Sequence, residues 1–219
     1  GAVIAYYQKT RHVFGRLKIE VLDSAGNVVD TLAAGKRKGV NRVVWPMRMK
    51  RPQVPTAAQA AFFSAQGPRV LPGRYTVRLT KAGQVVEMPI EVGLDRRAKF
   101  TAEDRKAQFD ATMEAHALFG RMSALVNKLN GYKQLVAQRS AAENADAATK
   151  QRLAAFGERV ESVRKEIVAT KEGGAITGEE RLREQLDYAY GALVGWEGRP
   201  GDYQIARVKT LEREFAEVE

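Results

Sequence analysis

The sequence predicts an α+β protein of two domains, an antiparallel β-sandwich followed by an antiparallel bundle of three to four helices. Up to residue 98, apolar and polar residues alternate in short stretches, as they do in half-buried strands. A proline-rich segment at 46–72 interrupts these strands. From residue 101 onward, apolar residues recur at alternating steps of three and four, which is typical of helices that pack on one another. We therefore expect domains at 1–98 and 101–219.

The first predicted strands are short and separated by turn residues. Residues 3–7 are apolar and aromatic, and residues 16–23 show the clearest alternation in the chain. The Ser-Ala-Gly-Asn stretch at 24–27 supplies residues that tolerate a positive φ, so it predicts a turn into a return strand at 28–32.

The next strands frame the long loop. Strands are predicted at 39–45 and 75–80, and Trp45 is expected to be a core residue. A final strand at 85–92 contains Pro89, which restricts it to a sheet edge or a bulge. Six or seven short strands at this spacing are typical of an immunoglobulin-like or fibronectin-like sandwich.

The loop at 46–72 is too long for a hairpin, and its prolines exclude a continuous strand. We expect residues 56–63 to form one or two helical turns that place Phe62 or Phe63 on the sandwich. Two interpretations of the loop remain open: a functional loop, or a flap that covers a sheet edge.

The first helix carries the longest apolar seam. Thr101 is its predicted N-cap, and Gly131 is the one place where we expect that the helix could break and fold back. An unbroken helix would be longer than its partners, so another chain or a further domain of a parent protein would cover part of its seam. The predicted association seam is Leu118, Met122, Leu125 and Leu129.

Three further helices follow. The second is expected at 153–167 with Asn144 or Asp146 as its cap, and the third opens at the capping box 177–180. Trp196 ends the inner face of the third helix and is expected to be a core residue. A Pro-Gly break then precedes the fourth helix at 205–218.

The net charge of +10 is concentrated in the first half. Residues 1–99 contain 18 Lys or Arg and 6 Asp or Glu, whereas residues 100–219 contain 18 and 20. This basic surface indicates either an anionic partner or simple solvation. Because aromatic residues do not alternate with the basic ones, we do not expect a nucleic-acid partner. The candidate anion-binding residues are Lys36, Arg37, Lys38, Arg48, Lys50 and Arg51.

Residues for catalysis are sparse. The chain has no cysteine and two histidines, His12 and His116, and neither has a neighbouring histidine or a tight carboxylate cluster at metal-ligand spacing. Gly35-Lys36 lacks the upstream glycine and the Ser/Thr of a phosphate-binding loop. No apolar run is long enough to cross a membrane. We therefore expect no catalytic site, no metal and no cofactor.

Two groups of motifs support a family resemblance. A glycine at 39, a strand ending in Trp45, and Pro72-Gly73 before Tyr75 resemble the immunoglobulin-like domain of flagellar hook-capping proteins. With the long loop, the exit at 94–97 and the helices, the chain resembles the C-terminal region of exported BNR/Asp-box, sortilin-like β-propeller proteins, which are often labelled glycosyl hydrolases.

The resemblance implies a non-catalytic accessory region of a larger exported bacterial protein, located outside the cell, in the periplasm or at the cell surface. Its partners would be the upstream domain of that protein, another protein, or a second copy through the helices. One alternative is a basic module that binds nucleic acid or another polyanion. Another is part of a glycoside hydrolase whose catalytic propeller lies outside this chain, since no Asp-box repeat is present. The start at Gly1 also leads us to expect a piece of a longer protein.

Overall fold

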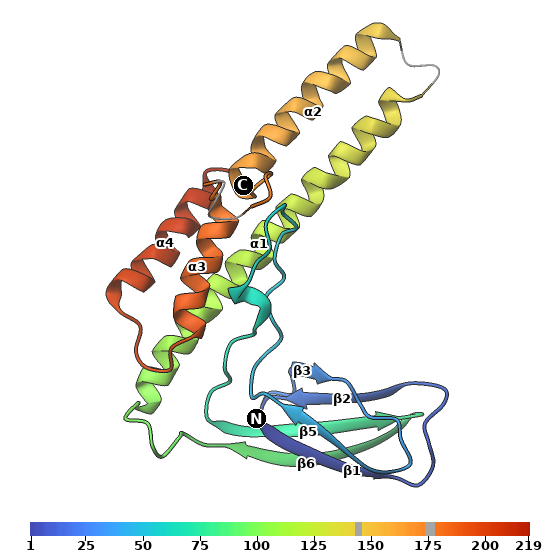
Figure 1. Cartoon of the computed structure of the whole chain (residues 1–219), viewed down its shortest axis with the longest axis vertical. Coiled ribbons are helices and arrows are strands. Elements are labelled where there is room, and N and C mark those ends of the chain that lie inside the picture. The colour runs from blue at the N-terminus through green and yellow to red at the C-terminus, as the bar shows by residue number, and fades with distance from the viewer. Residues whose placement is uncertain (143–145, 174–177) are drawn as a thin grey trace. The chain divides into compact units, whose positions relative to one another are not determined.

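The structure, a computed structural model, describes residues 1–142, 146–173 and 178–219. In these residues it has six strands in two antiparallel sheets and four α-helices (Figure 1), which confirms the predicted α+β class. The chain divides into two compact units. The sheet unit comprises Gly1–Arg51, Gln66–Phe109 and Glu197–Arg199, and the helical unit comprises Pro52–Ala65, Asp110–Trp196 and Pro200–Glu219.

The sheet unit holds all six strands. One sheet has the order β3-β2-β5-β6 and the other pairs β1 with β4, always antiparallel. Pro89 lies in β6, which is an edge strand as predicted. The strands are β1 Ala2–Gln8, β2 Leu17–Leu22, β3 Val28–Leu32, β4 Gly39–Trp45, β5 Gly73–Lys81 and β6 Gln84–Val92.

Trp45 and Tyr75 join the two sheets in one core. Trp45 is fully buried, as predicted, and its ring centroid lies 5.4 Å from that of Tyr75. The Trp45 Nε1–H donates to the Arg48 carbonyl at 3.0 Å, and the Tyr75 hydroxyl donates to the Leu71 carbonyl at 2.8 Å. Both aromatic side chains therefore bury their rings and satisfy their polar atoms.

The helices are bounded differently than predicted: α1 and α2 are longer, and α3 is shorter. They are α1 Ala102–Ser140, α2 Ala147–Ile167, α3 Leu182–Val194 and α4 Asp202–Ala216. α1 continues through Gly131 without a break. α3 begins after the predicted capping box at 177–180, whose Thr177 lies outside the described residues. α1 belongs to the sheet unit up to Phe109 and to the helical unit from Asp110 onward.

Two of the predicted caps are present. The Thr101 hydroxyl accepts from the Asp104 amide at 3.1 Å, and the Asp104 carboxylate accepts from the Thr101 amide at 3.1 Å, which closes a capping box. The Asp146 carboxylate accepts from the Thr149 amide at 2.6 Å at the start of α2. The alternative cap, Asn144, lies outside the described residues.

The helical unit has a single apolar core. Phe119 of α1 and Tyr190 of α3 meet there at 5.8 Å between ring centroids, and Leu211 and Phe215 of α4 are fully buried beside them. Trp196 is not a core residue, contrary to the prediction, and is 52% exposed. The reason is that α3 ends at Val194, so Trp196 lies beyond the helix face that is buried.

The ends of the long loop form a narrow neck within the sheet unit. The Met49 amide donates to the Pro68 carbonyl at 2.8 Å, and the Val70 amide donates to the Met47 carbonyl at 3.0 Å. The two backbones approach so closely at Gly67 that a Cβ atom there would lie 1.8 Å from the Met49 carbonyl oxygen. Glycine is therefore required at this position.

The middle of the loop, Pro52–Ala65, belongs to the helical unit, and we call it the strap. Phe63, which we expected to lie on the sandwich, packs instead over Gly191 of α3, where a Cβ atom would lie 2.4 Å from its ring. The helical turns expected at 56–63 are replaced by one short 3-10 turn at Phe63–Ala65. Val54 and Ala57 pack against the helical core, so the strap has its apolar contacts there.

Candidate interaction site

An uncovered part of the sheet unit's inner face is the candidate site. Met88 of β6 lies opposite Val77 of β5, and Val86 lies opposite Leu79, so both β6 residues are on the face that carries the core. Yet Val86 is 59% exposed and Met88 is 66% exposed. Large apolar side chains on the core face of a sheet are normally covered, so this exposure marks a surface that a partner can bury.

These side chains line a groove between β1 and β6. The groove has a volume of about 320 Å³, at the lower end of the roughly 300–1,000 Å³ that is usual for binding pockets. β1 forms one wall, β6 forms the other, and residues of β2 and β5 form the floor. The lining residues are Val3, Ile4, Ala5, Tyr6, Ile19, Val77, Leu79, Val86, Met88, Pro89 and Ile90.

Tyr6 places a phenol group in the groove lining, and its hydroxyl is already hydrogen-bonded within the chain. Its hydroxyl donates to the Gly35 carbonyl at 2.6 Å, and the Gln8 side-chain amide donates to the same oxygen at 2.7 Å. Burial raises the pKa of Tyr6 above 10.0, so the phenol is neutral at pH 7. The groove therefore offers apolar side chains and strand backbone rather than reactive groups.

The two walls of the groove are different kinds of sheet edge. β1 has the sequence AVIAYYQ, with no proline and no charge, and in the described residues it pairs only with β4. β6 contains Pro89, which has no N–H, and the acids Glu87 and Glu91. Charge and proline on an edge protect it against pairing with further strands. The edge of β1 lacks this protection.

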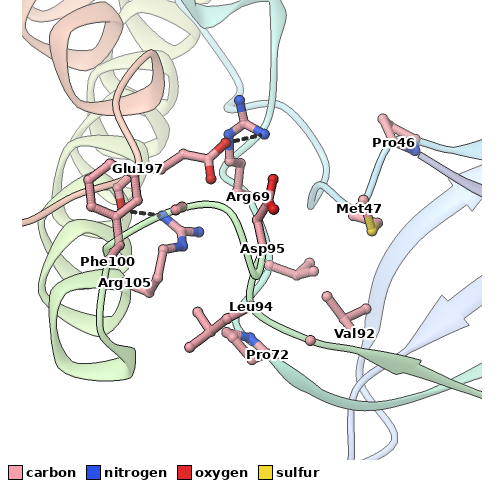
Figure 2. Close-up of a pocket in the computed structure, with 13 residues that line it drawn as sticks. Pro46, Met47, Arg69, Pro72, Val92, Leu94, Asp95, Phe100, Arg105 and Glu197 are labelled. Atoms are coloured by element: carbon pink, nitrogen blue, oxygen red, sulfur yellow. Dashed lines mark hydrogen bonds and ion pairs between the residues drawn. The ribbon is translucent and has the colours of Figure 1, made fainter.

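A second pocket in the sheet unit, of about 180 Å³, is built around two arginines (Figure 2). The Arg69 guanidinium pairs with the Glu197 carboxylate at 2.9 Å, and Arg105 donates to the Glu197 carbonyl at 3.3 Å. Burial lowers the pKa of Arg105 more than the neighbouring Glu197 raises it, so the net pKa lies below its usual value. Asp95 lies beside them, and hydrogen bonds from Arg97 hold its pKa at about 2. Glu197 therefore binds both Arg69 and Arg105, and Arg97 binds Asp95, so we assign these charges a structural role.

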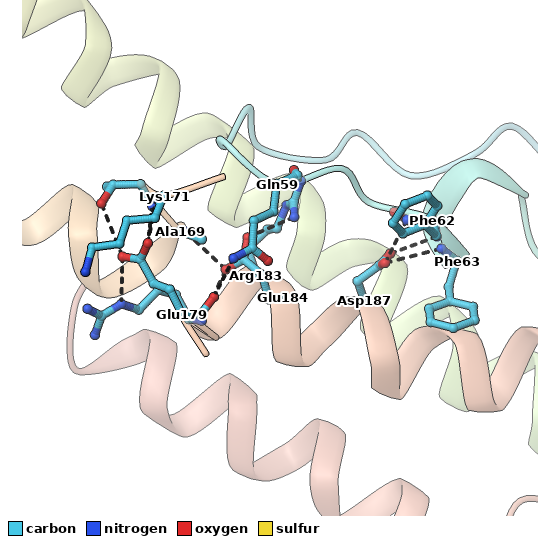
Figure 3. A network of polar contacts seen from close by, with 12 residues as sticks. Gln59, Phe62, Phe63, Ala169, Lys171, Glu179, Arg183, Glu184 and Asp187 are labelled. Carbon is cyan, nitrogen blue, oxygen red and sulfur yellow. Dashed lines mark hydrogen bonds and ion pairs between the residues drawn. The ribbon is translucent and has the colours of Figure 1, made fainter. Parts of the chain in front are cut away.

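Within the helical unit, acids on and just before α3 bind backbone amides (Figure 3). The Asp187 carboxylate accepts from three successive amides of the strap, those of Phe62 at 3.0 Å, Phe63 at 3.2 Å and Ser64 at 2.9 Å. The Arg183 guanidinium donates to the strap carbonyl of Gln59 at 2.6 Å. The network therefore fixes the strap to α3.

The same network fixes the chain that follows α2. Glu184 accepts from the Ala169 amide at 3.1 Å. Glu179 accepts from the amides of Thr170 at 3.0 Å and Lys171 at 2.6 Å. A pocket of about 490 Å³ lies beside these groups. Because the carboxylates already accept hydrogen bonds from backbone amides, we assign the network a structural role.

No family model matches the chain, and no curated protein or solved structure matches it. In residues 1–142, 146–173 and 178–219, no group of His, Asp or Glu side chains could hold a metal ion. No helix of that part is long and apolar enough to cross a membrane.

The structure separates the six candidate anion-binding residues into two groups. Lys36, Arg37 and Lys38 are exposed just before β4, and the second group, residues 48–51, follows it. The seven residues of β4 lie between them, about 20 Å of extended chain. Arg48 is half-buried and donates to the Gly67 carbonyl at 2.8 Å. The six residues do not form one continuous patch.

The structure buries most of the predicted association seam inside the chain. Leu118, Met122 and Leu129 are 7% exposed or less, and Leu125 is half-buried against the same core. They pack in the core that α1 shares with α2, α3 and α4, which differs from our expectation of a contact with another chain. Beyond them, α1 contacts α2 through the rings of Tyr132 and Phe156, and Leu135 is 53% exposed.

Sequence reasoning missed the groove residues as a site. The alternation of Val86, Met88 and Ile90 already placed them on one face of β6. Their exposure depends on whether a strand of the other sheet covers them, and the position of that sheet follows from the pairing of β1 with β4. A pattern within one strand does not contain this information.

Proposed function

We propose that this chain is a non-catalytic accessory module that binds a segment of another protein in the groove between β1 and β6. The observation that carries the proposal is the exposure of Val86 and Met88 on the core face of their sheet. Burying them would release about 25 cal/mol for each Å² of apolar surface removed from water. The groove lining, with its one engaged phenol, suits binding rather than catalysis.

The fold that accompanies this proposal is an immunoglobulin-like sandwich followed by a helical bundle. The sheet orders β3-β2-β5-β6 and β1-β4 correspond to the C′-C-F-G and B-E neighbours of such sandwiches. The bond from the Tyr75 hydroxyl to the Leu71 carbonyl has the form of their tyrosine corner. α1 and α2 lie antiparallel in Figure 1, with the ring centroids of Tyr132 and Phe156 5.9 Å apart.

The resemblance to exported β-propeller proteins supplies the proposed context. In it, the chain is a C-terminal accessory region outside the cytoplasm, and any glycoside hydrolase activity belongs to a propeller elsewhere in the protein. Polyanion binding ranks second. It is favoured by residues 31–86, which contain eleven Lys or Arg and no Asp or Glu, but the two separated groups of basic residues weaken it.

Selection from a displayed random peptide library tests the proposed function. Two variants of one strand serve as a matched pair: Met88→Glu puts a charge on the groove face, and Val85→Glu puts the same charge on the opposite face. Both positions are more than half exposed, so both variants should fold, which circular dichroism checks. We expect enriched peptides to bind the wild type and Val85→Glu but not Met88→Glu. Enrichment of no peptide, or of peptides indifferent to Met88→Glu, would contradict the proposal.

A further inference from the structure

We infer that the groove accepts an extended strand of a partner protein, apolar on one side and acidic on the other, which pairs with the free edge of β1. This inference rests on the proposed function and specifies the chemistry of the partner. Three observations support it: the open edge of β1, the apolar residues along the groove, and the distribution of charge around β1 and β4.

The edge of β1 offers the hydrogen bonds that such a strand needs. In an antiparallel pair, alternate residues direct their N–H and C=O groups away from the partner strand. β4 satisfies one edge of β1, and in the described residues no strand pairs with the other. In an immunoglobulin-like sandwich, the strand that corresponds to β1 has a neighbour on both sides, A and E. An added strand at β1 would therefore complete a usual three-stranded arrangement.

The edge of β6, which forms the other wall, is less suitable. Pro89 cannot donate a hydrogen bond, and Glu87 and Glu91 repel an acidic strand. Glu87 is already paired with Arg78 at 2.6 Å. β6 therefore contributes its exposed apolar side chains, and β1 contributes the backbone.

The spacing of the groove residues sets the pattern of the partner. Side chains of a strand alternate between its two faces, so every second residue of an added strand would point into the groove. Those residues would lie between the inner side chains of β1, Ile4 and Tyr6, and Val86 and Met88 of β6. Aliphatic side chains fit this lining because the Tyr6 hydroxyl is already bound to Gly35.

The charge around β1 and β4 sets the chemistry of the outward residues. Residues 1–16 and 33–51, which hold β1, β4 and their flanking loops, contain ten Lys or Arg and no Asp or Glu. Arg42 lies opposite Ala5 at the centre of the β1–β4 pair, and Lys9 follows β1 at the end where Lys36–Lys38 precede β4. An acidic strand meets this surface with complementary charge. A second copy of β1 would instead bring two such basic surfaces together.

The test uses three labelled synthetic heptapeptides and fluorescence anisotropy with the full chain. The first alternates valine and glutamate, the second has the same residues in two blocks, and the third alternates valine and lysine. We expect the first to bind about tenfold more tightly than either control, a difference of about 1.4 kcal/mol. Met88→Glu should weaken its binding about tenfold or more, because the peptide then buries an unpaired charge. Val85→Glu should leave it within about twofold, since it adds the same charge on the other face.

Backbone pairing has its own readout. The valine–glutamate peptide should protect amides of β1 from hydrogen exchange, and N-methylation of its alternate amides should abolish binding. Equal binding by the block or lysine peptide, or no protection in β1, would overturn the inference. So would a dimer of the wild-type chain, detected by light scattering, that Met88→Glu dissociates, since the occupant would then be a second copy.

This outcome is separable from that of the proposed function. If library selection yields peptides that need Met88 but are helical or basic, the groove binds proteins and the strand inference fails alone. If neither selected nor designed peptides distinguish Met88→Glu from Val85→Glu, both fail.

Discussion

Asp187 binds three successive amides of the strap through one carboxylate, so replacing it should loosen residues 62–64 of the strap without unfolding the helices. In Asp187→Ala the three amides of Phe62, Phe63 and Ser64 lose their acceptor. The residues Phe62 and Phe63 are 77% and 45% exposed and the bonds of their amides to Asp187 are partly buried, whereas Ser64 is 2% exposed and the bond of its amide is buried. One buried donor left unsatisfied costs about 1–3 kcal/mol, and each exchange of a bond for water costs about 0.5–1.5 kcal/mol.

Together these contributions give a loss of about 2–6 kcal/mol for the attachment of the strap, and we take about 3 kcal/mol as the working value. Hydrogen exchange at the three amides measures this directly, because local opening limits their exchange. We expect exchange about 100-fold faster in Asp187→Ala, since each 1.4 kcal/mol is a factor of ten. Amides in the middle of α1 should keep their protection.

Two further variants sharpen the comparison. Asp187→Asn keeps one oxygen acceptor but turns an NH₂ group toward the remaining donors, so its effect should lie between wild type and Asp187→Ala. Glu180→Ala removes an exposed acid near the same helix start and should change stability by less than about 0.5 kcal/mol. Unchanged exchange at the three strap amides in Asp187→Ala would refute the role of this carboxylate. Equally fast exchange throughout α1 would show that the strap does not open on its own.

Three other predictions concern stability and charge. Trp45→Ala should destabilise the sheet unit by about 3–5 kcal/mol, measured by urea unfolding. Its control, Val44→Ala, changes an exposed neighbour and should cost under about 1 kcal/mol. Equal effects of the two variants would mean that Trp45 is not a core residue. Burial raises the pKa of Glu179, but hydrogen bonds from Lys171 and Thr170 lower it more, so the net pKa lies below 4.5. Glu179 therefore stabilises the fold above pH 4.5, and this contribution disappears as the pH falls through the lowered pKa. The difference in unfolding free energy between the wild type and Glu179→Gln should therefore vanish in acid. A difference that does not change with pH would contradict this. Binding to duplex DNA should be weak. If only one group of three basic residues contacts the DNA, log K against log salt should have a slope of about −3. A slope near −5 would mean that both groups, Lys36–Lys38 and Arg48, Lys50 and Arg51, contact the DNA together.

The strands could be predicted well because each carries its own pattern. Alternation in β2 and β5, together with the aromatic residues Trp45 and Tyr75, is enough to indicate the sheets and their shared core. Pro89 likewise restricts β6 to a sheet edge or a bulge, and β6 lies at an edge. In each case the information lies within one strand or a few neighbouring residues.

The strap and the groove could not be predicted, because each depends on residues far apart in the chain. The strap is rich in alanine and proline and has no apolar period, so nothing in it indicates Asp187, more than 120 residues away, as its partner. Trp196 was misassigned because α3 ends two residues before it, and helix ends are the least certain part of a pattern. The exposure of Met88 follows from the sheet order, which alternation within β6 leaves open.

The path of the chain through the strap has a consequence for biosynthesis. The strap leaves the ribosome early, between β4 and β5, but the carboxylate that fixes it lies in α3, near the end of the chain. Until α3 is made, the amides of Phe62, Phe63 and Ser64 lack the Asp187 carboxylate, and the core that Val54 and Ala57 contact lacks its α3 and α4 residues. Contacts between residues so distant in sequence form late, because a long loop must first close. A nascent chain stalled before α3 should therefore carry formed strands together with a strap that proteases can cut.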